Sequence, residues 1–168
     1  MAEVVEFQTK QSFEQVYEEC YDKIYKYTYT LLMNKEDTED VVADTFITAY
    51  EKYDTYDSTK SSVSTWLSRI AHNKAVNLVR SASYRNRDEL PEELPGEVSA
   101  DFTKNVEDNE MLLNLYSNLT EDEREFLNLR YTMGLKDAEV AEILDISPKA
   151  VNKRYQRLLA KCKDILND

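Results

Sequence analysis

Glycine and proline are scarce in this chain, whose 168 residues contain two Gly and three Pro. Architectures built from many short strands need such residues in their turns, so a turn-rich β fold is excluded. Leu, Ala, Glu, Lys and Asp are frequent instead, and apolar residues recur at spacings of three and four. That spacing places the apolar side chains on one side of a helix, which predicts an all-α chain.

Residues for covalent or metal chemistry are equally few. The two cysteines, Cys20 and Cys162, lie far apart among apolar positions, where buried thiols are expected. His72 is the only histidine, and the sequence contains no catalytic triad, HExxH or GxGxxG motif. We therefore expect that the chain is not an enzyme and needs neither a metal nor another cofactor.

Long hydrophobic runs are also missing, since none approaches the roughly 20 residues that span a bilayer. The segment Met1–Lys10 lacks the basic start and the apolar stretch of a signal peptide. The expected location is therefore the cytoplasm, without insertion into a membrane.

Negative charge prevails, with a formal net charge of -12, but it is unevenly spread. Ser58–Arg87 and Ile146–Lys163 each hold six Lys or Arg and no acidic residue. The rest of the chain is acidic. This division predicts that the two cationic segments meet phosphate groups and that the acidic remainder meets a basic partner.

The first half predicts three helices. Apolar periodicity indicates a helix from Phe13 to about Met33, and a second helix that Asp37 caps, with Asp40 three residues later. The small polar residues of Asp57–Ser62 predict a loop, and a third, cationic helix begins near Val63. The expected buried face of the second helix consists of Val42, Thr45, Phe46, Ala49, Tyr50 and Tyr53.

The segment Asp88–Glu110 separates the halves. It holds nine acidic residues, two Pro and one Gly, without a helical period, which predicts a flexible linker. The expected organisation is therefore a helical domain over residues 1–87, an acidic linker over 88–110 and a second helical domain over 111–168.

The second half predicts a helix-turn-helix. Thr120 and Glu123 form a capping box for a helix that Gly134 terminates, and a short helix Asp137–Leu144 follows. Ser147 and Pro148 then suit the start of a last helix. Its cationic and amide side chains predict a recognition helix that reads DNA. The expected core residues here are Phe126, Leu127, Leu129, the stem of Arg130, Val151, Tyr155, Leu158, Leu159, Cys162 and Leu166.

At this point the chain resembles the extracytoplasmic-function branch of the bacterial sigma-70 family of RNA polymerase initiation factors. Two segments of the first half resemble the family's region 2, namely Thr38–Tyr50 and Trp66–Arg80. The second half resembles region 4 through Leu119–Glu125, Leu129–Tyr131, Gly134–Leu135 and Ala141–Ser147.

The resemblance implies two partners, core RNA polymerase and promoter DNA. Glu39, Asp40, Asp44 and Phe46 would bind the coiled coil of the largest polymerase subunit, and region 4 would meet the flap region. The linker would pass through the RNA exit path, where its acids imitate RNA. An anti-sigma protein is common in the family as a further partner.

The resemblance also assigns the two cationic segments to promoter elements. The loop before the third helix would hold a flipped base, and the helix itself the single strand. The implied minus-ten residues are Ser58, Lys60, Ser61, Trp66, Arg69, Asn73, Lys74, Asn77 and Arg80. The implied minus-thirty-five residues are Ser147, Lys149, Asn152, Lys153, Arg154, Gln156 and Arg157.

The sequence departs from the family's pattern at three positions. Asn77 stands where Asp is usual, Lys136 where Ser or Thr often caps the short helix, and Asp145 where Gly is common in the turn. Asp tolerates a left-handed backbone, so the turn is expected to form. Two other functions remain open at this stage: a stand-alone helix-turn-helix transcriptional regulator, and a helical adaptor without a DNA role.

Overall fold

The computed structural model describes residues 11–81, 106–131 and 133–167, and these residues contain helices and no strand. The all-α prediction is therefore confirmed. The elements of the first half are α1 (Phe13–Leu32), α2 (Lys35–Lys52), a 3-10 turn η1 (Tyr53–Thr55) and α3 (Val63–Arg80). The elements of the second half are α5 (Val106–Ser117), α6 (Glu121–Tyr131), α7 (Asp137–Leu144) and α8 (Pro148–Asn167).

Helix α1 has defined signals at both ends. The Ser12 hydroxyl accepts a hydrogen bond from the Gln15 backbone N–H, and the Gln15 side chain accepts one from the Ser12 N–H. Met33 ends the helix in a left-handed conformation with φ 51°, close to the predicted end. A left-handed residue after the last turn lets its N–H reach back, here to the Tyr29 carbonyl at 2.7 Å.

The start of α2 differs from the prediction. Asn34 is the cap, because its Oδ1 accepts from the Asp37 backbone N–H at 3.0 Å, and Asp37 lies inside the first turn. Asn34 directly follows the left-handed Met33, so the C-cap of α1 and the N-cap of α2 are adjacent residues. A cap at Asp37 was therefore wrong by three positions.

Tyr50 was also predicted wrongly, since it is 68% exposed. The buried face of α2 is defined by Val42, Thr45, Phe46 and Ala49. Successive helix residues are separated by about 100°, so Tyr50 is turned out of the core although it follows Ala49 directly.

Helix α3 completes a three-helix bundle with α1 and α2. The Ser62 hydroxyl caps it by accepting from the Thr65 backbone N–H at 3.2 Å. Leu67, Ala71 and Ala75 are fully buried at its contacts with the other two helices. The small alanines let the helix axes approach closely, while the remaining faces of α3 stay available to other elements.

The second half begins earlier than predicted, because α5 starts at Val106 and takes the last five residues of the expected linker. The remainder of that linker, with its acidic residues up to 105, lies outside the described residues. The capping box of α6 is confirmed: Thr120 N–H donates to Glu123 Oε2 at 2.9 Å, and Glu123 N–H donates to Thr120 Oγ1 at 3.3 Å. Gly134 follows with φ 63°, a conformation natural to glycine.

The turn between α7 and α8 forms as expected. Asp145 adopts φ 54° and ψ 48°, so a left-handed Asp replaces the glycine that is common there. Ser147 Oγ accepts from the Ala150 backbone N–H at 3.1 Å and caps α8, whose first residue is Pro148. Leu166 is 43% exposed and does not belong to the core as predicted, since it lies in the last turn of a helix that extends beyond its neighbours.

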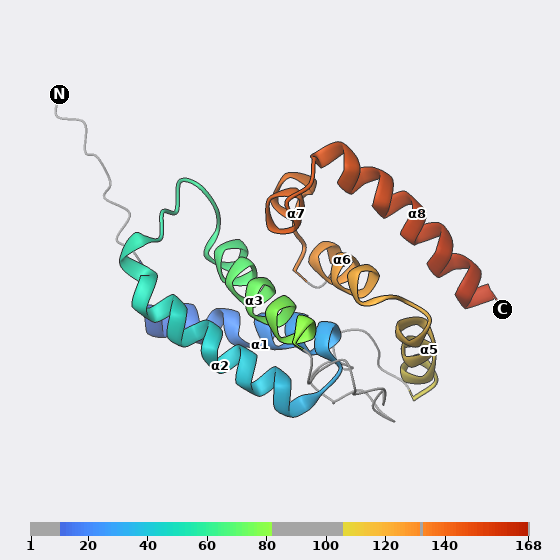
Figure 1. Ribbon diagram of the computed structural model, residues 1–168, viewed down its shortest axis with the longest axis horizontal. Coiled ribbons are helices and arrows are strands. Elements are labelled where there is room, and N and C mark those ends of the chain that lie inside the picture. Colours follow the sequence, from blue (N-terminus) through green and yellow to red (C-terminus); the bar gives the residue numbers. More distant parts are fainter. Residues whose placement is uncertain (1–10, 82–105, 132, 168) are drawn as a thin grey trace.

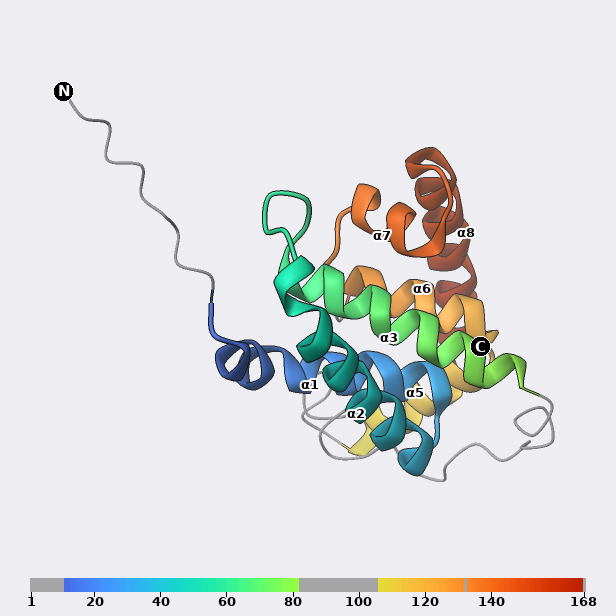
Figure 2. The ribbon, with the colours of Figure 1, turned by 60° about the vertical axis from the view of Figure 1, so that its left-hand side comes forward.

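The two halves pack against each other. Figures 1 and 2 show α6 and α7 lying along α1 and α3, with α8 on the outer side of α6 and α7. The buried apolar residues form one contiguous cluster that contains Ile24 and Leu67 of the first half together with Phe126 and Val140 of the second. The chain thus has two helical units whose cores are continuous.

A buried carboxylate lies at the junction of the halves. Glu125 of α6 is 3% exposed, and its Oε1 accepts a hydrogen bond from the Tyr27 hydroxyl of α1. The same oxygen contacts Nδ1 of His72 on α3. Burial, followed by the nearby Glu125 carboxylate, raises the pKa of Tyr27 well above its usual value, so Tyr27 stays a neutral donor.

Tyr27→Phe should reduce the free energy of unfolding by about 1.5–3 kcal/mol, the usual contribution of a hydrogen bond to a charged group. The ring remains in place, but Glu125 loses a donor at a site where it is only 3% exposed. Urea denaturation measures the effect, with Tyr17→Phe as the control because the Tyr17 side chain is 45% exposed. Equal losses in the two variants would contradict the assigned hydrogen bond.

Alkaline pH should destabilise the fold through buried phenols. Burial, together with Cys162 nearby, raises the pKa of Tyr116 to about 12. Below pH 10 the phenol is neutral in folded and unfolded chains, whereas above pH 10 the unfolded chain ionises first. The contribution of Tyr116, up to about 3 kcal/mol, is therefore lost as pH rises from 10 to 12. In urea titrations at several pH values Tyr116→Phe should flatten this decline, and an unchanged decline would refute it.

Candidate polymerase and nucleic-acid interfaces

An acidic face runs along α2. Glu39, Asp40 and Asp44 are all exposed, and Asp40 and Asp44 are four residues apart and so lie above one another. Lys35 Nζ lies 3.8 Å from Glu39 Oε1, but both side chains are exposed, so this pair adds little stability. These exposed carboxylates are accessible to an external cationic surface.

Phe46 does not lie on this face. It is 5% exposed, and its ring packs against Tyr17 and Tyr21 at centroid distances of 4.8 and 5.9 Å. The apolar residues that do reach the surface of α2 are Ile47, 57% exposed, and Tyr50. Continuing the helical spacing from Asp40 through Asp44 leads to Ile47, so the sequence contained the signal for an acidic face with apolar neighbours.

The loop between η1 and α3 is held in a defined conformation. Asp57 Oδ1 accepts from the backbone N–H of Thr59 at 2.9 Å and from its hydroxyl at 2.6 Å. These two hydrogen bonds lower the pKa of the Asp57 carboxyl, the one from the hydroxyl most. The Lys60 N–H donates to the Asp57 carbonyl at 3.1 Å, which closes the turn. The side chains of Ser58 and Lys60 are exposed on it.

A cluster of aromatic rings packs beside this loop. Tyr56 lies 5.1 Å from Trp66 and 5.9 Å from Tyr53, measured between ring centroids. The Tyr56 hydroxyl donates to the Ser61 carbonyl at 3.0 Å, which ties the loop to the rings. Trp66 is half-buried within this group, so it both packs and presents an edge beside the loop.

The cationic residues of α3 share a stripe with its amides. Arg69, Asn73, Asn77 and Arg80 follow one another at spacings of four, four and three, which keeps them on one side of the helix. Lys74 lies next to this stripe, with its Nζ 3.9 Å from Asp44 Oδ2 on α2. Asn73, Asn77 and Arg80 are exposed, whereas Arg69 pairs with Glu142 of α7.

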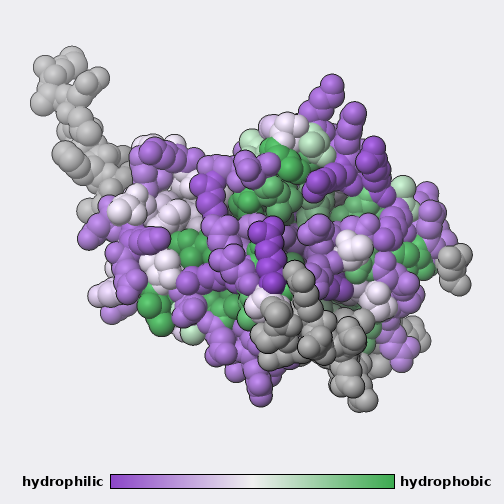
Figure 3. Space-filling model, in the orientation of Figure 1, coloured by the Kyte–Doolittle hydropathy of each residue, from purple (hydrophilic) through white to green (hydrophobic). Residues whose placement is uncertain are grey.

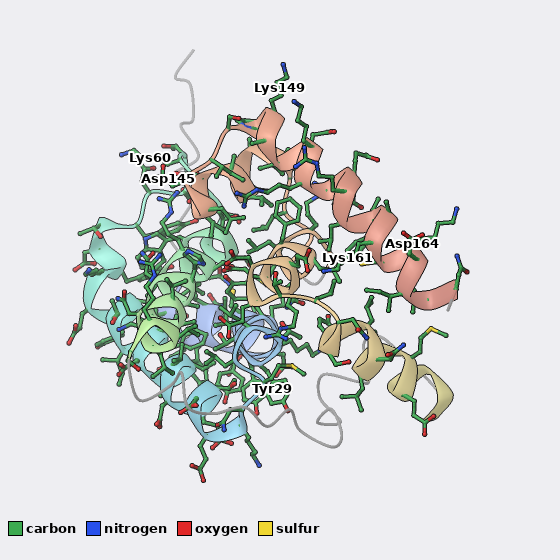
Figure 4. The ribbon with its side chains drawn as sticks, turned by 45° about the vertical axis from the view of Figure 1, so that its right-hand side comes forward. Tyr29, Lys60, Asp145, Lys149, Lys161 and Asp164 are labelled. Atoms are coloured by element: carbon green, nitrogen blue, oxygen red, sulfur yellow. The ribbon has the colours of Figure 1, made fainter. Side chains whose placement is uncertain are left out.

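The N-terminal part of α8 presents a separate polar face. Lys149, Asn152, Lys153 and Gln156 are exposed at positions that recur on one side of the helix. Lys149 projects away from the rest of the molecule in Figure 4. Ser147 has another role, since its hydroxyl caps the helix. An exposed face of Lys, Asn and Gln side chains can contact both phosphates and base edges.

Arg154 and Arg157 are also exposed and lie beside this face, toward α6. They line a pocket of about 360 Å³ together with Asp122, Glu123 and Lys161. Lys161 Nζ donates to Glu123 Oε2 at 2.6 Å, and in Figure 4 Lys161 lies on the side of α8 that faces α6. An acid of α6 therefore pairs with Lys161, while Arg154 and Arg157 share the pocket with the acids and remain exposed.

Sequence reasoning did not identify an apolar groove between α5, α6 and α8. It has a volume of about 220 Å³ and is lined by Leu112, Leu115, Tyr116, Leu127, Tyr131 and Leu159, among others. Elsewhere, the face in Figure 3 is mostly hydrophilic, and apolar residues form separate patches on it. Residues of three helices meet in the groove, so no local pattern in the sequence marked it.

Neither a metal cluster nor a membrane span is found in the part of the chain that the structure describes. No three His, Cys, Asp or Glu side chains are placed to hold an ion there. None of the described helices has the length and apolar character needed to cross a bilayer.

Comparison with known proteins gives two matches that follow each other along the chain. Sigma-70 region 2 matches residues 16–85, and sigma-70 region 4 matches residues 109–162. The first match contains α2, the loop and α3, and the second contains α6, α7 and most of α8.

Individual relatives agree with these matches. The chain is similar to the ECF RNA polymerase sigma factor SigM of Bacillus subtilis, with 26% identity over 93% of this chain and 96% of SigM. It is 31% identical to the ECF RNA polymerase sigma-E factor of Haemophilus influenzae, over 76% of this chain and 74% of that protein.

A solved structure supports the fold. The sigma factor RpoE of Bartonella quintana, in complex with the anti-sigma factor NepR, superposes with a TM-score of 0.76 over 92% of this chain and 96% of RpoE. Their sequence identity is 19%, so this likeness concerns the fold alone. From the two matched regions and the identity to sigma-E, the chain belongs to the sigma-70 family of RNA polymerase sigma factors, in its extracytoplasmic-function branch.

Proposed function

We propose that this chain binds core RNA polymerase in the cytoplasm, recognises a two-part promoter and helps to open it, without chemistry of its own. The observation that carries the proposal is the placement of two acid-free cationic segments on α3 and α8, each within its matched sigma region. A factor of this kind needs one surface for polymerase and two for DNA. The described residues offer a surface suited to each task.

The polymerase surface is the acidic face of α2. Glu39, Asp40 and Asp44 supply charge for a basic coiled coil of the largest subunit, and Ile47 and Tyr50 supply apolar contact area beside it. Apolar anchors surrounded by charged residues are common at protein interfaces. Phe46 supports this face from inside by packing. The apolar groove of α5, α6 and α8 suits the flap region as a second contact.

The minus-ten surface combines the loop after η1 with the stripe on α3. A loop already fixed by Asp57 and Tyr56 needs little ordering when it receives an unstacked base. The exposed Lys60 and Ser58 lie on that loop, and Asn73, Asn77 and Arg80 continue along the helix for the strand that follows. Cationic side chains beside a base-binding loop suit single-stranded rather than duplex DNA.

The minus-thirty-five surface is the outer face of α8. Asn152 and Gln156 have amide groups that can pair with adenine edges, while Lys149 and Lys153 can contact phosphates. Arg154 and Arg157 are exposed beside this face, next to a pocket that they share with Asp122 and Glu123 of α6. We therefore assign base reading to the two amides and general affinity to the lysines.

An anti-sigma protein is a further proposed partner. RpoE of Bartonella quintana is held by the anti-sigma factor NepR in a structure with the same fold as this chain.

The net charge of -12 opposes unaided binding to duplex DNA, so promoter recognition should require polymerase. A stand-alone regulator would instead bind duplex unaided, with a steep dependence on salt.

Transcription on fragmented genomic DNA tests the function. Core polymerase with this chain should produce new RNA 5′ ends that share paired upstream elements, and core polymerase alone should not. In parallel, the free chain should fail to protect the same promoters from nuclease at physiological salt. Absence of new starts with folded protein and active polymerase would reject the sigma factor function, and protection by the free chain would favour the stand-alone regulator.

The double variant Asp40→Arg/Asp44→Arg should abolish polymerase binding and leave helicity unchanged, because both side chains are exposed and repel a basic surface after reversal. The matched control is Glu14→Arg/Glu18→Arg, which reverses two exposed acids at the same spacing on α1. Affinity chromatography of the complex measures the effect. Equal binding by the two double variants would remove α2 as the docking face.

Substitutions on α8 should separate specificity from affinity. Asn152→Ala or Gln156→Ala should cost about 1–3 kcal/mol at one minus-thirty-five position and relax base preference there. Lys153→Ala should weaken all promoters by a similar factor, because a phosphate contact carries no sequence information. Holoenzyme selection from a randomised promoter library measures both. An unchanged preference in both amide variants would mean that α8 reads DNA through other residues.

A further inference from the structure

Acidic side chains of the second half contact the cationic helix of the first. Glu142 of α7 pairs with Arg69 of α3, and Glu139 Oε1 accepts a hydrogen bond from the Thr65 hydroxyl at 3.0 Å. Glu125 of α6 meets His72 one turn further along α3. Three carboxylates from two helices thus contact α3 between Thr65 and His72.

Glu139 is held in place from both sides. Its second oxygen, Oε2, accepts from the Lys136 backbone N–H at 2.9 Å and so supports the start of α7. Lys136 stands where the family often has a capping Ser or Thr, and its side chain makes no capping hydrogen bond. Glu139 therefore both stabilises the start of α7 and accepts from Thr65. The hydrogen bond at the start of α7 thus orients the carboxylate that accepts from Thr65.

The Glu125 contact is the most deeply buried of the three. A carboxylate that loses its water must be compensated by donors, and here Tyr27 of α1 and His72 of α3 supply them. When the halves separate, all three groups return to water. The contact is therefore favourable only when α1, α3 and α6 are packed together. It is either complete, with the two halves packed, or absent, with the halves apart.

One of the three contacts engages a residue that the proposed function assigns to DNA. Arg69 belongs to the stripe of Asn73, Asn77 and Arg80, and its guanidinium cannot hold Glu142 and a phosphate in the same fork. Beyond the contact, α3 and the second half border a cavity of about 460 Å³ lined by His72, Arg80, Glu121, Asp122 and Arg154, among others. Acidic groups of α6 thus border the same cavity as Arg80, the last residue of the stripe.

We propose that α6 and α7 act as an intramolecular mask, in which Glu125, Glu139 and Glu142 occupy α3 as strand phosphates would and keep the free protein from binding single-stranded DNA. The proposal rests on the assignment of α3 to the minus-ten strand. Opening of the two halves exposes Arg69 and His72. The observed affinity for a strand is then the intrinsic affinity multiplied by the open fraction.

Glu142→Arg tests the mask through affinity. The substitution replaces an ion pair with a repulsion between exposed side chains, so the open fraction should rise and single strands should bind about two- to tenfold tighter. The probe is a pool of short fluorescent single strands of random sequence, followed by anisotropy without polymerase. The matched control is Asp164→Arg, which makes the same change in net charge at an exposed site on α8.

A charge swap separates masking from net charge. Arg69→Glu alone repels Glu142 and opens the mask, whereas Arg69→Glu/Glu142→Arg restores the pair with reversed polarity. Masking predicts that the swap binds strands more weakly than Arg69→Glu, although it carries more positive charge. Simple attraction of strands to positive charge predicts the opposite order. Tighter binding by the swap, or equal gains for Glu142→Arg and Asp164→Arg, would overturn the proposal.

Small-angle scattering without DNA tests the same contact independently of the proposed function. Glu125→Gln/Glu142→Arg should increase the radius of gyration relative to the wild type while circular dichroism shows unchanged helicity. An unchanged radius would overturn the mask itself. An increased radius with no strand binding by any variant, alone or with core polymerase, would instead overturn the assignment of α3 to DNA.

Discussion

The arrangement of the whole molecule depends on the burial of one carboxylate. Glu125 enters the junction of α1, α3 and α6 with almost no exposed surface, and its oxygen is satisfied by Tyr27 and His72. A buried carboxylate without donors is costly, so the three helices must assemble together. This requirement orients α6, and α7 and α8 follow it through the continuous core.

The cationic residues can pair either with acids of the same chain or with an external polyanion. The acids of α6 and α7 neutralise cations of α3 and α8 within the chain, as in the pairs Arg69–Glu142 and Lys161–Glu123. The exposed acids Glu39, Asp40 and Asp44 of α2 face outwards, although Asp44 also lies 3.9 Å from Lys74 of α3. A chain with a net charge of -12 can thereby keep cationic surfaces that are exposed only in part until a polyanion or another partner displaces the internal carboxylates.

Much of the local structure could be predicted from the sequence. The cap of α6, the left-handed Asp145 and the start of α8 at Pro148 all depend on residues within a few positions of each other. Errors arose where two local signals competed, since Asp37 and Asn34 are both good caps and the left-handed Met33 selected Asn34. The exposure of Tyr50 and the burial of Phe46 depend on how α2 is rotated about its own axis relative to α1. The pattern of apolar residues defines this rotation only to within about one residue.

By itself the sequence determined most of the helices, most of their caps, and the stripes of cations and amides on α3 and α8. These features arise from spacings of three and four residues and from side chains that bond to their own backbone. Only the tertiary structure decided that α6 and α7 cover α3, that Arg154 and Arg157 face acids, and that a groove forms between α5, α6 and α8. Such contacts join residues separated by many positions, as Tyr27 and Glu125 are. Their geometry depends on how rigid helices pack, which no local pattern encodes.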